Sequence, residues 1–233
     1  MPEFTFIAAG ATNQGLVRSN NEDAFFIDPG SSLFLVADGL GGHAGGEIAS
    51  STVIEVVSDA ADSWAAWTNP AEQMPQLFAE ADSAVRTIAT GPLTNMGTTV
   101  AALFVRGERY WTAHAGDSRA YRLRGDRFEQ LTRDHTPEQE RHGEDTPDYR
   151  SGMITRAIGI GDETSFEITD GSLASGDCFL LCSDGLTDAV RDDHIARLLQ
   201  ANDPEQTVVD SLIAAALAAG GPDNVTVVMV VVR

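Results

Sequence analysis

Basic residues are scarce in this chain. Its 233 residues include 15 Lys and Arg against 35 Asp and Glu, which gives a formal net charge of −20. Nucleic acids and anionic membranes bind clustered Lys and Arg, so this balance argues against both as partners. The acidic excess keeps the chain soluble, and part of it would be neutralised if several carboxylates held metal ions.

Cysteines and long hydrophobic runs are also few. Cys178 and Cys182 lie four residues apart in one predicted strand, so their Cα atoms are ~13 Å apart, beyond the ~7 Å limit for a disulfide. We expect both thiols to be reduced, which suits a cytoplasmic protein. The longest apolar run, 225–232, is far shorter than the ~20 residues of a membrane helix, and residues 1–10 do not resemble a signal peptide.

The hydrophobic pattern groups strands and helices instead of alternating them. The predicted strands are 4–9, 24–27, 33–37, 98–106, 109–114, 118–123, 127–131 and 225–232, and the regular pattern resumes at 153–160, 165–168 and 178–182. Helices are predicted over 45–64 and 70–88, the second with Asn69 and Glu72 in a capping box, and another after the cap Asp203. This grouping predicts an α+β fold. We expect one domain, 1–233, and a monomer.

One stretch has no material for a core. Residues 132–151 contain no aliphatic side chain and only one aromatic, Tyr149. We expect a mobile charged flap on the surface at about 132–152, with one short helix starting near Thr136.

Carboxylates follow three apolar runs. The run 33–37 ends in Asp38-Gly39, the run 179–183 ends in Asp184-Gly185, and Asp223 comes just before the run 225–232. Asp and Gly are common turn residues, so one such end is unremarkable. Three together predict a site, because crowded carboxylates repel each other unless a hard divalent cation lies between them.

Six short motifs carry a family resemblance. They are Gly15-Leu16-Val17-Arg18-Ser19-Asn20-Asn21-Glu22-Asp23, Asp38-Gly39-Leu40-Gly41-Gly42-His43, Gly97-Thr98-Thr99, Gly116-Asp117-Ser118-Arg119, Ser183-Asp184-Gly185-Leu186-Thr187-Asp188 and Asp223-Asn224-Val225-Thr226. In this order they resemble the metal-dependent protein phosphatases of the protein phosphatase 2C type, in their bacterial form. The resemblance implies a four-layer α-β-β-α sandwich of two antiparallel sheets between helix pairs.

The same resemblance implies roles for individual residues. Asp38 would bridge two Mn²⁺ or Mg²⁺ ions, the Gly39 carbonyl would bind one of them, and Asp184 and Asp223 would bind the other. Asp117 would join Asp184 in holding a third, weaker ion. Glu22, Asp23 and Asn224 would orient metal-bound water, or Asp23 would instead contact a metal ion indirectly. A water bridging the two ions would then attack phosphorus in line, and the planar guanidinium of Arg18 would grip the phosphate.

The chain departs from the animal pattern of this family in two places. Leu40 replaces a histidine, and His43 matches the bacterial version, where we expect it to pack in the glycine loop instead of acting as the acid. We therefore expect metal-bound water to protonate the leaving oxygen. The flap before Arg156 is also shorter than usual, which should alter substrate docking and third-metal binding.

The resemblance implies a cytoplasmic phosphatase acting on phosphoserine and phosphothreonine in proteins, opposite a Ser/Thr kinase. Two alternatives remain: a catalytically silent adaptor with the same fold, and a hydrolase of small phosphoesters or phosphodiesters. Each of these residues also has a non-functional interpretation. Asp38, Asp184 and Asp223 would only form turns, Arg18 would pair with Glu22 on the surface, and His114 would be a hydrogen-bonded core residue. The acidic surface suggests that basic residues near the phosphosite help binding.

Overall fold

The computed structural model describes residues 4–41, 44–64, 66–67, 69–140, 153–201 and 203–233. The elements follow in the order β1 (Phe6–Asn13), β2 (Asp23–Asp28), β3 (Leu33–Leu40), α1 (Ala44–Trp64), α2 (Pro70–Ile88), η1 (Gly91–Leu93), β4 (Gly97–Thr98), β5 (Val100–Arg106), β6 (Arg109–Ala115), β7 (Arg119–Arg124), β8 (Arg127–Gln130), α3 (Pro137–Glu140), β9 (Glu167–Ser172), β10 (Cys178–Cys182), α4 (Asp184–Thr187), α5 (Asp192–Leu199), α6 (Glu205–Ala218) and β11 (Val225–Val232).

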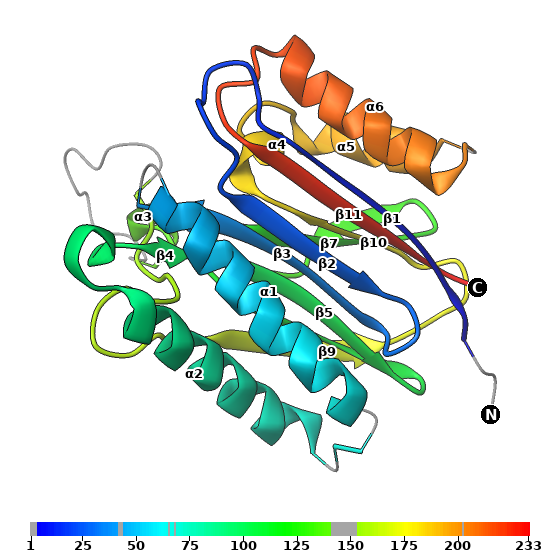
Figure 1. Cartoon of the computed structure of the whole chain (residues 1–233). Helices are drawn as coiled ribbons and strands as arrows, with labels where there is room; N and C mark the ends of the chain where they lie inside the picture. The colour runs from blue at the N-terminus through cyan, green and yellow to red at the C-terminus, as the bar shows by residue number, and fades with distance from the viewer. Residues whose placement is uncertain (1–3, 42–43, 65, 68, 141–152, 202) are drawn as a thin grey trace.

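The strands form two antiparallel sheets that lie face to face (Figure 1). One sheet has the order β1-β11-β10-β7-β8 and the other the order β2-β3-β5-β6-β9, with β4 pairing with β3 beside this path. Strand β11 therefore lies between β1 and β10, so the last strand of the chain pairs with the first. This arrangement brings both ends of the sequence into one sheet.

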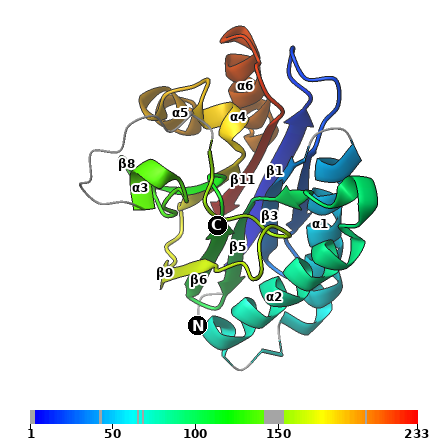
Figure 2. The same ribbon diagram turned by 90° about the vertical axis from the view of Figure 1, so that its left-hand side faces the viewer.

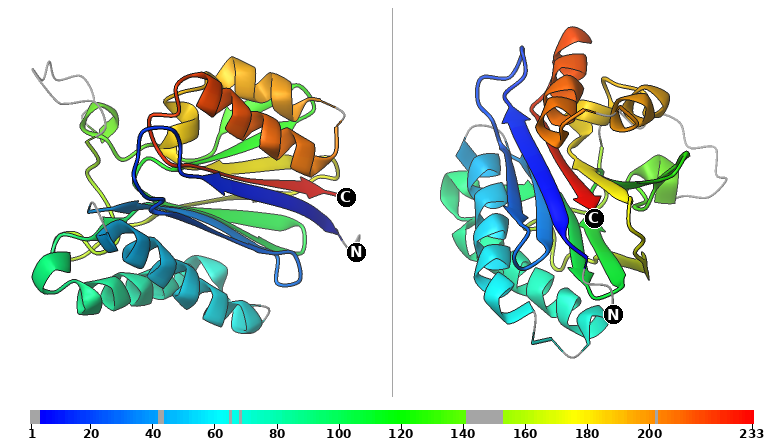
Figure 3. Two further views of the ribbon diagram at one scale, coloured as in Figure 1. Left: turned by 45° about the horizontal axis from the view of Figure 1, so that its top comes forward. Right: turned by 90° about the vertical axis from the view of Figure 1, so that its right-hand side faces the viewer.

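Helices cover the outer faces, so the molecule has four layers (Figures 2 and 3). Three separate hydrophobic clusters lie at the three interfaces between these layers. One joins α1 and α2 to their sheet, one joins α4, α5 and α6 to the other sheet, and the third fills the space between the sheets. The α+β, α-β-β-α fold expected from the sequence is confirmed.

Several predicted element boundaries were wrong. Residues 153–160 form no strand, and only an isolated bridge joins Ile158 to Thr98. Strand β9 runs Glu167–Ser172 where 165–168 was predicted, and the run 98–106 is divided at Thr99 into β4 and β5. Helix α5, Asp192–Leu199, was not predicted by itself, because its apolar stripe spans only two turns. No helix in the described ranges is long and apolar enough to cross a membrane.

Two predicted helix caps differ from the structure. Asn69 is the N-cap of α2 but its side chain makes no capping bond, and Gln73, not Glu72, returns a side-chain oxygen to the Asn69 N–H at 3.0 Å. The N-cap of α6 is Pro204 instead of Asp203. Both helices are held by their buried apolar faces, so neither depends on its cap.

The predicted surface flap is wrong in its first part. Thr132, Asp134, His135 and Pro137 are buried, and α3 follows at Pro137–Glu140, as expected for the short helix. Asp134 accepts hydrogen bonds from the Arg119 guanidinium at 2.6 and 2.9 Å. Hydrogen bonds to polar partners therefore allow this segment to be buried although it has no aliphatic side chains. Residues 141–152 of the expected flap lie outside the described residues.

Candidate metal centre

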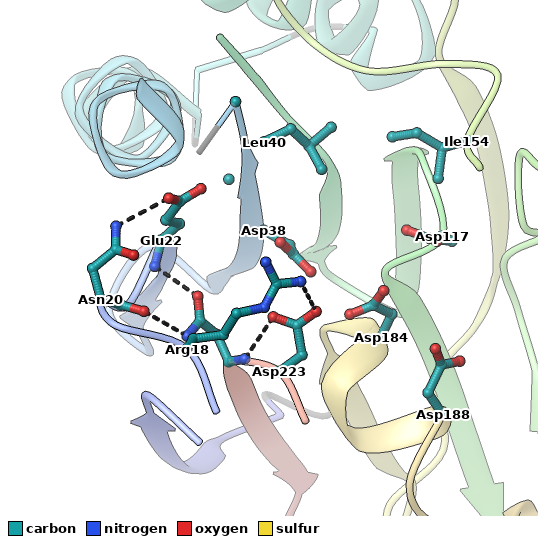
Figure 4. A pocket seen from close by; sticks show the side chains of 13 residues that line it. Arg18, Asn20, Glu22, Asp38, Leu40, Asp117, Ile154, Asp184, Asp188 and Asp223 are labelled. Atoms are coloured by element: carbon teal, nitrogen blue, oxygen red, sulfur yellow. Dashed lines mark hydrogen bonds and ion pairs between the residues drawn. The ribbon is translucent and has the colours of Figure 1, made fainter. Parts of the chain in front are cut away.

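Both predicted Asp-Gly pairs open onto one cavity of about 420 Å³. Figure 4 shows the carboxylates of Asp38, Asp184 and Asp223 pointing toward one another across it. Six acidic side chains line the cavity, and Arg18 is the one basic side chain among its described lining residues; the acids are Glu22, Asp38, Asp117, Asp184, Asp188 and Asp223. The predicted carboxylates therefore meet, although they come from distant parts of the sequence.

The two sheets contribute different parts of this cluster. Asp38 belongs to β3 of one sheet, where it lies opposite Asp23 of β2. Asp184 follows β10 and Asp223 precedes β11, which are neighbouring strands of the other sheet. Asp117 lies in the turn between β6 and β7, which belong to different sheets. The cavity thus spans the seam between the sheets.

Backbone bonds fix Asp38 at an irregular point of its strand. The Thr99 N–H and the Thr98 hydroxyl donate to the Asp38 carbonyl at 2.8 and 2.9 Å, and the Asp38 N–H donates to the Thr99 hydroxyl at 3.1 Å. The sequence predicted a strand that ends at Ala37 and turns at Asp38. In the structure, strand β3 instead continues through Asp38 to Leu40. The division between β4 and β5 at Thr99 is what holds Asp38 in place.

The glycines of the two Asp-Gly pairs are needed for close approach. A Cβ on Gly39 would lie 2.2 Å from the Gly46 carbonyl oxygen, and a Cβ on Gly185 would lie 1.9 Å from the Asn224 carbonyl oxygen. Gly39 thereby lets the start of α1 pack against β3, and Gly185 lets α4 pack against the turn before β11. Turn formation, which was the non-functional interpretation of both pairs, does not describe them: Asp38-Gly39 lies within β3 and Asp184-Gly185 opens α4.

Arg18 and Asn224 lie on the loop side of the cavity. The Arg18 guanidinium donates to Asp223 at 2.5 Å, so it does not pair with Glu22, and 56% of its side chain remains exposed. The Asn224 amide donates to the carbonyls of Gln14 and Asn20 and accepts from the Glu22 N–H, all within 2.9 Å. Asn224 therefore holds the loop that carries Arg18, and its predicted role in orienting metal-bound water stays a prediction.

Asp23 and Glu22 behave differently from each other. One Asp23 oxygen accepts hydrogen bonds from Thr226 and Ser183 at 2.6 and 2.8 Å, which ties β2 to the opposite sheet. The Glu22 carboxylate lines the cavity and accepts from Asn20 at 3.0 Å. Glu22 therefore lies at the cavity, whereas Asp23 is not among its described lining residues.

The acidic residues disturb one another's ionisation. Burial, followed by the charges of its acidic neighbours, raises the pKa of Asp184 to about 7. Burial likewise raises the pKa of Asp117 and of Asp23 to about 6. The pKa of Asp38 is raised well above its ordinary value by burial and by the charges of Asp23 and Asp184. Without a counter-charge, the site therefore resists holding all of its negative charges near neutral pH.

These residues fit divalent cations. One oxygen of Asp184 and one of Asp23 are buried without a hydrogen-bond partner, which is costly for a carboxylate. The acidic side chains offer carboxylate oxygens as ligands, which Mg²⁺ and Mn²⁺ prefer. A cation would both satisfy the unpaired Asp184 oxygen and offset the repulsion between the carboxylates.

Sequence reasoning missed Asp188 as a lining residue. It is four residues after Asp184, so the two lie on one face of the same helical turn, and burial raises its pKa. The spacing inside the motif 183–188 was the available signal. His43 cannot be placed, because it lies outside the described residues.

A second cluster of possible ligands is a packing feature. His114, His135 and Glu167 offer ligand atoms that lie within 4.8 Å of one another. The two rings stack at 4.5 Å with an interplanar angle of 12°, so one ion cannot lie in both ring planes, where the nitrogen lone pairs point. His114 Nε2 contacts the Arg133 carbonyl at 2.8 Å. The prediction of a hydrogen-bonded core histidine is confirmed.

We expect Mn²⁺ to bind more weakly in acid. Because the pKa of Asp184 is raised to about 7, the folded metal-free chain holds more protons than the unfolded chain from about pH 4 to 7. Its folded state therefore loses stability as pH rises through this window, and protons compete with metal as pH falls. Titration calorimetry should show the Mn²⁺ dissociation constant rising at least about tenfold from pH 7.5 to pH 5.5. A constant that does not change with pH would contradict these ionisation states.

Comparison with known proteins connects this geometry to a family. The family model described as "Protein phosphatase 2C" matches residues 16–218. The serine/threonine protein phosphatase PstP of Mycobacterium tuberculosis is 38% identical over 95% of this chain, and the chain spans 44% of that relative's length. The serine/threonine phosphatase stp of Listeria innocua is 31% identical, over 94% of this chain and 93% of its own length.

Solved structures agree with the sequence relatives. The catalytic domain of PstP in complex with two manganese ions superposes with a TM-score of 0.88 at 36% identity, covering 99% of both chains. PppA of Pseudomonas aeruginosa superposes with a TM-score of 0.84 at 32% identity, covering 99% of this chain and all of its own.

Proposed function

Because this chain belongs to the protein phosphatase 2C family, we propose that it hydrolyses phosphoserine and phosphothreonine in proteins with the help of Mn²⁺ or Mg²⁺. The observation that carries the proposal is the cavity with six acidic lining residues and Arg18. A phosphate dianion would be repelled from such a cavity unless cations occupied it first. A site of this composition therefore suits a reaction in which metal ions mediate between carboxylates and phosphate.

We assign the metal ligands as the sequence suggested. Asp38 would serve two ions, one together with the Gly39 carbonyl and the other together with Asp184 and Asp223, and Asp117 with Asp184 would hold a weaker third. When bound, two such ions activate water and stabilise the charge that develops on the phosphoryl oxygens. Asp23 ties β2 to the sheet that carries Asp184, and Asn224 fixes the arginine loop.

Arg18 binds the phosphate in this proposal. Its guanidinium lies at the cavity and more than half of its side chain is exposed, so it can turn from Asp223 to a substrate without unfolding its loop. A planar guanidinium donates two parallel hydrogen bonds to phosphate oxygens. No histidine is found among the lining residues that the structure describes. We therefore propose that a water molecule in the site donates the proton that the leaving serine or threonine oxygen takes up.

Removing the Arg18 guanidinium should weaken substrate binding. In Arg18→Ala we expect KM for a phosphothreonine peptide to rise about tenfold or more with little change in kcat, because a charge-assisted hydrogen bond contributes about 1.5–3 kcal/mol. Arg197→Ala, which removes an exposed arginine of α5, is the matched control and should leave KM unchanged. An unchanged KM in Arg18→Ala would refute the phosphate role.

The alternatives are separated by substrate profiling. With Mn²⁺, the purified protein should hydrolyse p-nitrophenyl phosphate and phosphothreonine peptides. It should leave bis-p-nitrophenyl phosphate, a diester, intact. Mn²⁺ binding without turnover of any ester would favour a silent adaptor. Turnover confined to small monoesters would favour a metabolite phosphatase.

We also propose a cellular setting. Two buried free cysteines suit a reducing compartment, so we place the protein in the cytoplasm. Because the relatives named above are serine/threonine phosphatases of bacteria, we also propose that it is a bacterial signalling enzyme, and that it acts as a monomer. Its partners would be proteins phosphorylated by a Ser/Thr kinase. A phosphoproteome comparison after gene deletion should show phosphoserine and phosphothreonine sites gaining occupancy, and no such gain would contradict this setting.

A further inference from the structure

A second cavity, of about 550 Å³, adjoins the candidate metal centre. Leu40 and Ile154 line both cavities, so the boundary between them is apolar. Figure 4 shows these two side chains together at the edge of the first cavity, away from Arg18 and Asp223. A polypeptide whose phosphorylated side chain enters the acidic cavity can therefore lay neighbouring residues over Leu40 and Ile154 into the second one.

The second cavity offers an exposed apolar surface. Ile160 lines it with 43% of its surface exposed, beside Ala157 and Ile154. Met153, which directly precedes Ile154, is 45% exposed. Large aliphatic side chains left open inside a cavity next to a catalytic centre are suited to cover an apolar group of a ligand.

The charge that remains in this cavity is negative. Its Arg156 is already paired with its Glu140 at 2.6 Å, so these two charges offset each other. Glu163 also lines the cavity and is exposed, and the described part of the chain offers its carboxylate no ion-pair partner. A cationic side chain would complement the carboxylate of Glu163, whereas an acidic one would be repelled.

The wall of the second cavity is preformed. Asp82 of α2 accepts hydrogen bonds from the Gly159 N–H and the Thr164 hydroxyl at 2.7 and 2.8 Å. Ile158 exchanges two backbone hydrogen bonds with Thr98 of β4, and the Arg86 guanidinium reaches the carbonyls of Ile160 and Gly161. Because these bonds hold residues 157–164 against helix and sheet, a ligand loses little free energy in ordering the wall.

We infer that this second cavity is a specificity subsite for the substrate polypeptide, and that it selects an aliphatic residue together with an arginine or lysine close to the phosphorylated residue. The inference rests on the proposed phosphatase function. The aliphatic side chain packs on Ile154 and Ile160, and the basic side chain pairs with Glu163. Arg18 and the metal ligands would then recognise the phosphate alone.

The test uses phosphothreonine nonapeptides in which each position from three before to three after the phosphothreonine carries Leu, Ala, Arg, Gln or Glu in turn. With Mn²⁺ bound, we expect one position where Leu exceeds Ala about tenfold in kcat/KM. At another position we expect Arg to exceed Gln about two- to fivefold, as for an exposed ion pair. Glu at that second position should give the lowest value.

Two variants assign these preferences to the cavity. Glu163→Gln should remove the preference for Arg while keeping that for Leu, and Ile160→Ala should lower the preference for Leu at least about threefold while keeping that for Arg. Each readout is a ratio between two peptides on one variant, so a general change in activity cancels. Ile7→Ala, also 43% exposed but on β1, and Glu108→Gln, at the exposed β5–β6 turn, are matched controls that should keep both ratios.

The outcomes separate the inference from the function on which it rests. Equal kcat/KM for all flanks, or preferences that persist in Glu163→Gln and Ile160→Ala, would overturn the subsite while phosphopeptide turnover still supported the phosphatase. Turnover of p-nitrophenyl phosphate without turnover of any phosphopeptide would overturn both. A change of oligomeric state in Ile160→Ala, with unchanged ratios, would make the cavity a contact between copies of the chain and would overturn the subsite.

Discussion

Replacing Asp38 by asparagine is expected to lower kcat by about a thousandfold or more and to make the metal-free protein more stable at pH 8. The activity falls because the carboxylate assigned to both ions is lost, and metal ions contribute several kcal/mol to transition-state stabilisation. The stability rises because burial and acidic neighbours raise the pKa of Asp38 well above its ordinary value, so its charge opposes folding at high pH. Steady-state kinetics with p-nitrophenyl phosphate and thermal unfolding in EDTA measure the two effects.

Asp28→Asn is the matched control for this substitution. Strand β2 begins at Asp23, opposite Asp38, and ends at Asp28. Asp28 accepts hydrogen bonds from the Ser31 hydroxyl and the Gly30 N–H, which lower its pKa. Asparagine there should leave activity unchanged and slightly reduce stability above pH 4, a stability change of the opposite sign from that at Asp38. If Asp38→Asn retained more than a tenth of the parent kcat, Asp38 would not be a bridging ligand.

Removing metal should abolish activity and lower the melting temperature. We expect no phosphatase turnover after dialysis against EDTA, with recovery on adding Mn²⁺. When free Mn²⁺ is about a hundred times its dissociation constant, binding should stabilise the fold by about 2.7 kcal/mol, or about 5–10 °C in a chain of this size. The shift follows because the cation offsets the repulsion that raises the pKa values of Asp38 and Asp184.

The Asp38→Asn variant also serves as the control for chelation. Its repulsion is already reduced and one ligand is missing, so its melting temperature should change less on adding Mn²⁺ than that of the parent. Turnover that persisted in a chain shown by elemental analysis to be metal-free would refute the metal-dependent mechanism.

The sequence predicted elements best where local pattern and burial agree. The strands Cys178–Cys182 and Val225–Val232 and the helix Pro70–Ile88 have the predicted bounds, because each carries a continuous or periodic apolar face. Residues 153–160 were harder: their apolar side chains divide between the core and two cavities, and Asp82 and Arg86 hold them from another element. A pattern in one segment cannot reveal a partner 70 or more residues away.

The candidate site was predicted from carboxylates at strand ends and from the motif order. The sequence could not predict which strands lie next to one another and so bring these residues together. Asp23 is tied to Ser183 and Thr226, and Asn224 to the arginine loop, through hydrogen bonds between residues about 160 to 210 positions apart. Such contacts depend on the pairing of β1 with β11, which no local pattern specifies. Asp188 could have been found from its four-residue spacing to Asp184.

The division of the acidic residues between the two sheets has a consequence for the life of the protein in the cell. Cations bound at the seam would add a link between two sheets that otherwise meet through a packed apolar cluster and through the hydrogen bonds of Asp23 with Ser183 and Thr226. Chains made during manganese starvation would open more often and meet proteases sooner. Dephosphorylation capacity would then follow metal supply twice, through turnover rate and through the number of surviving molecules.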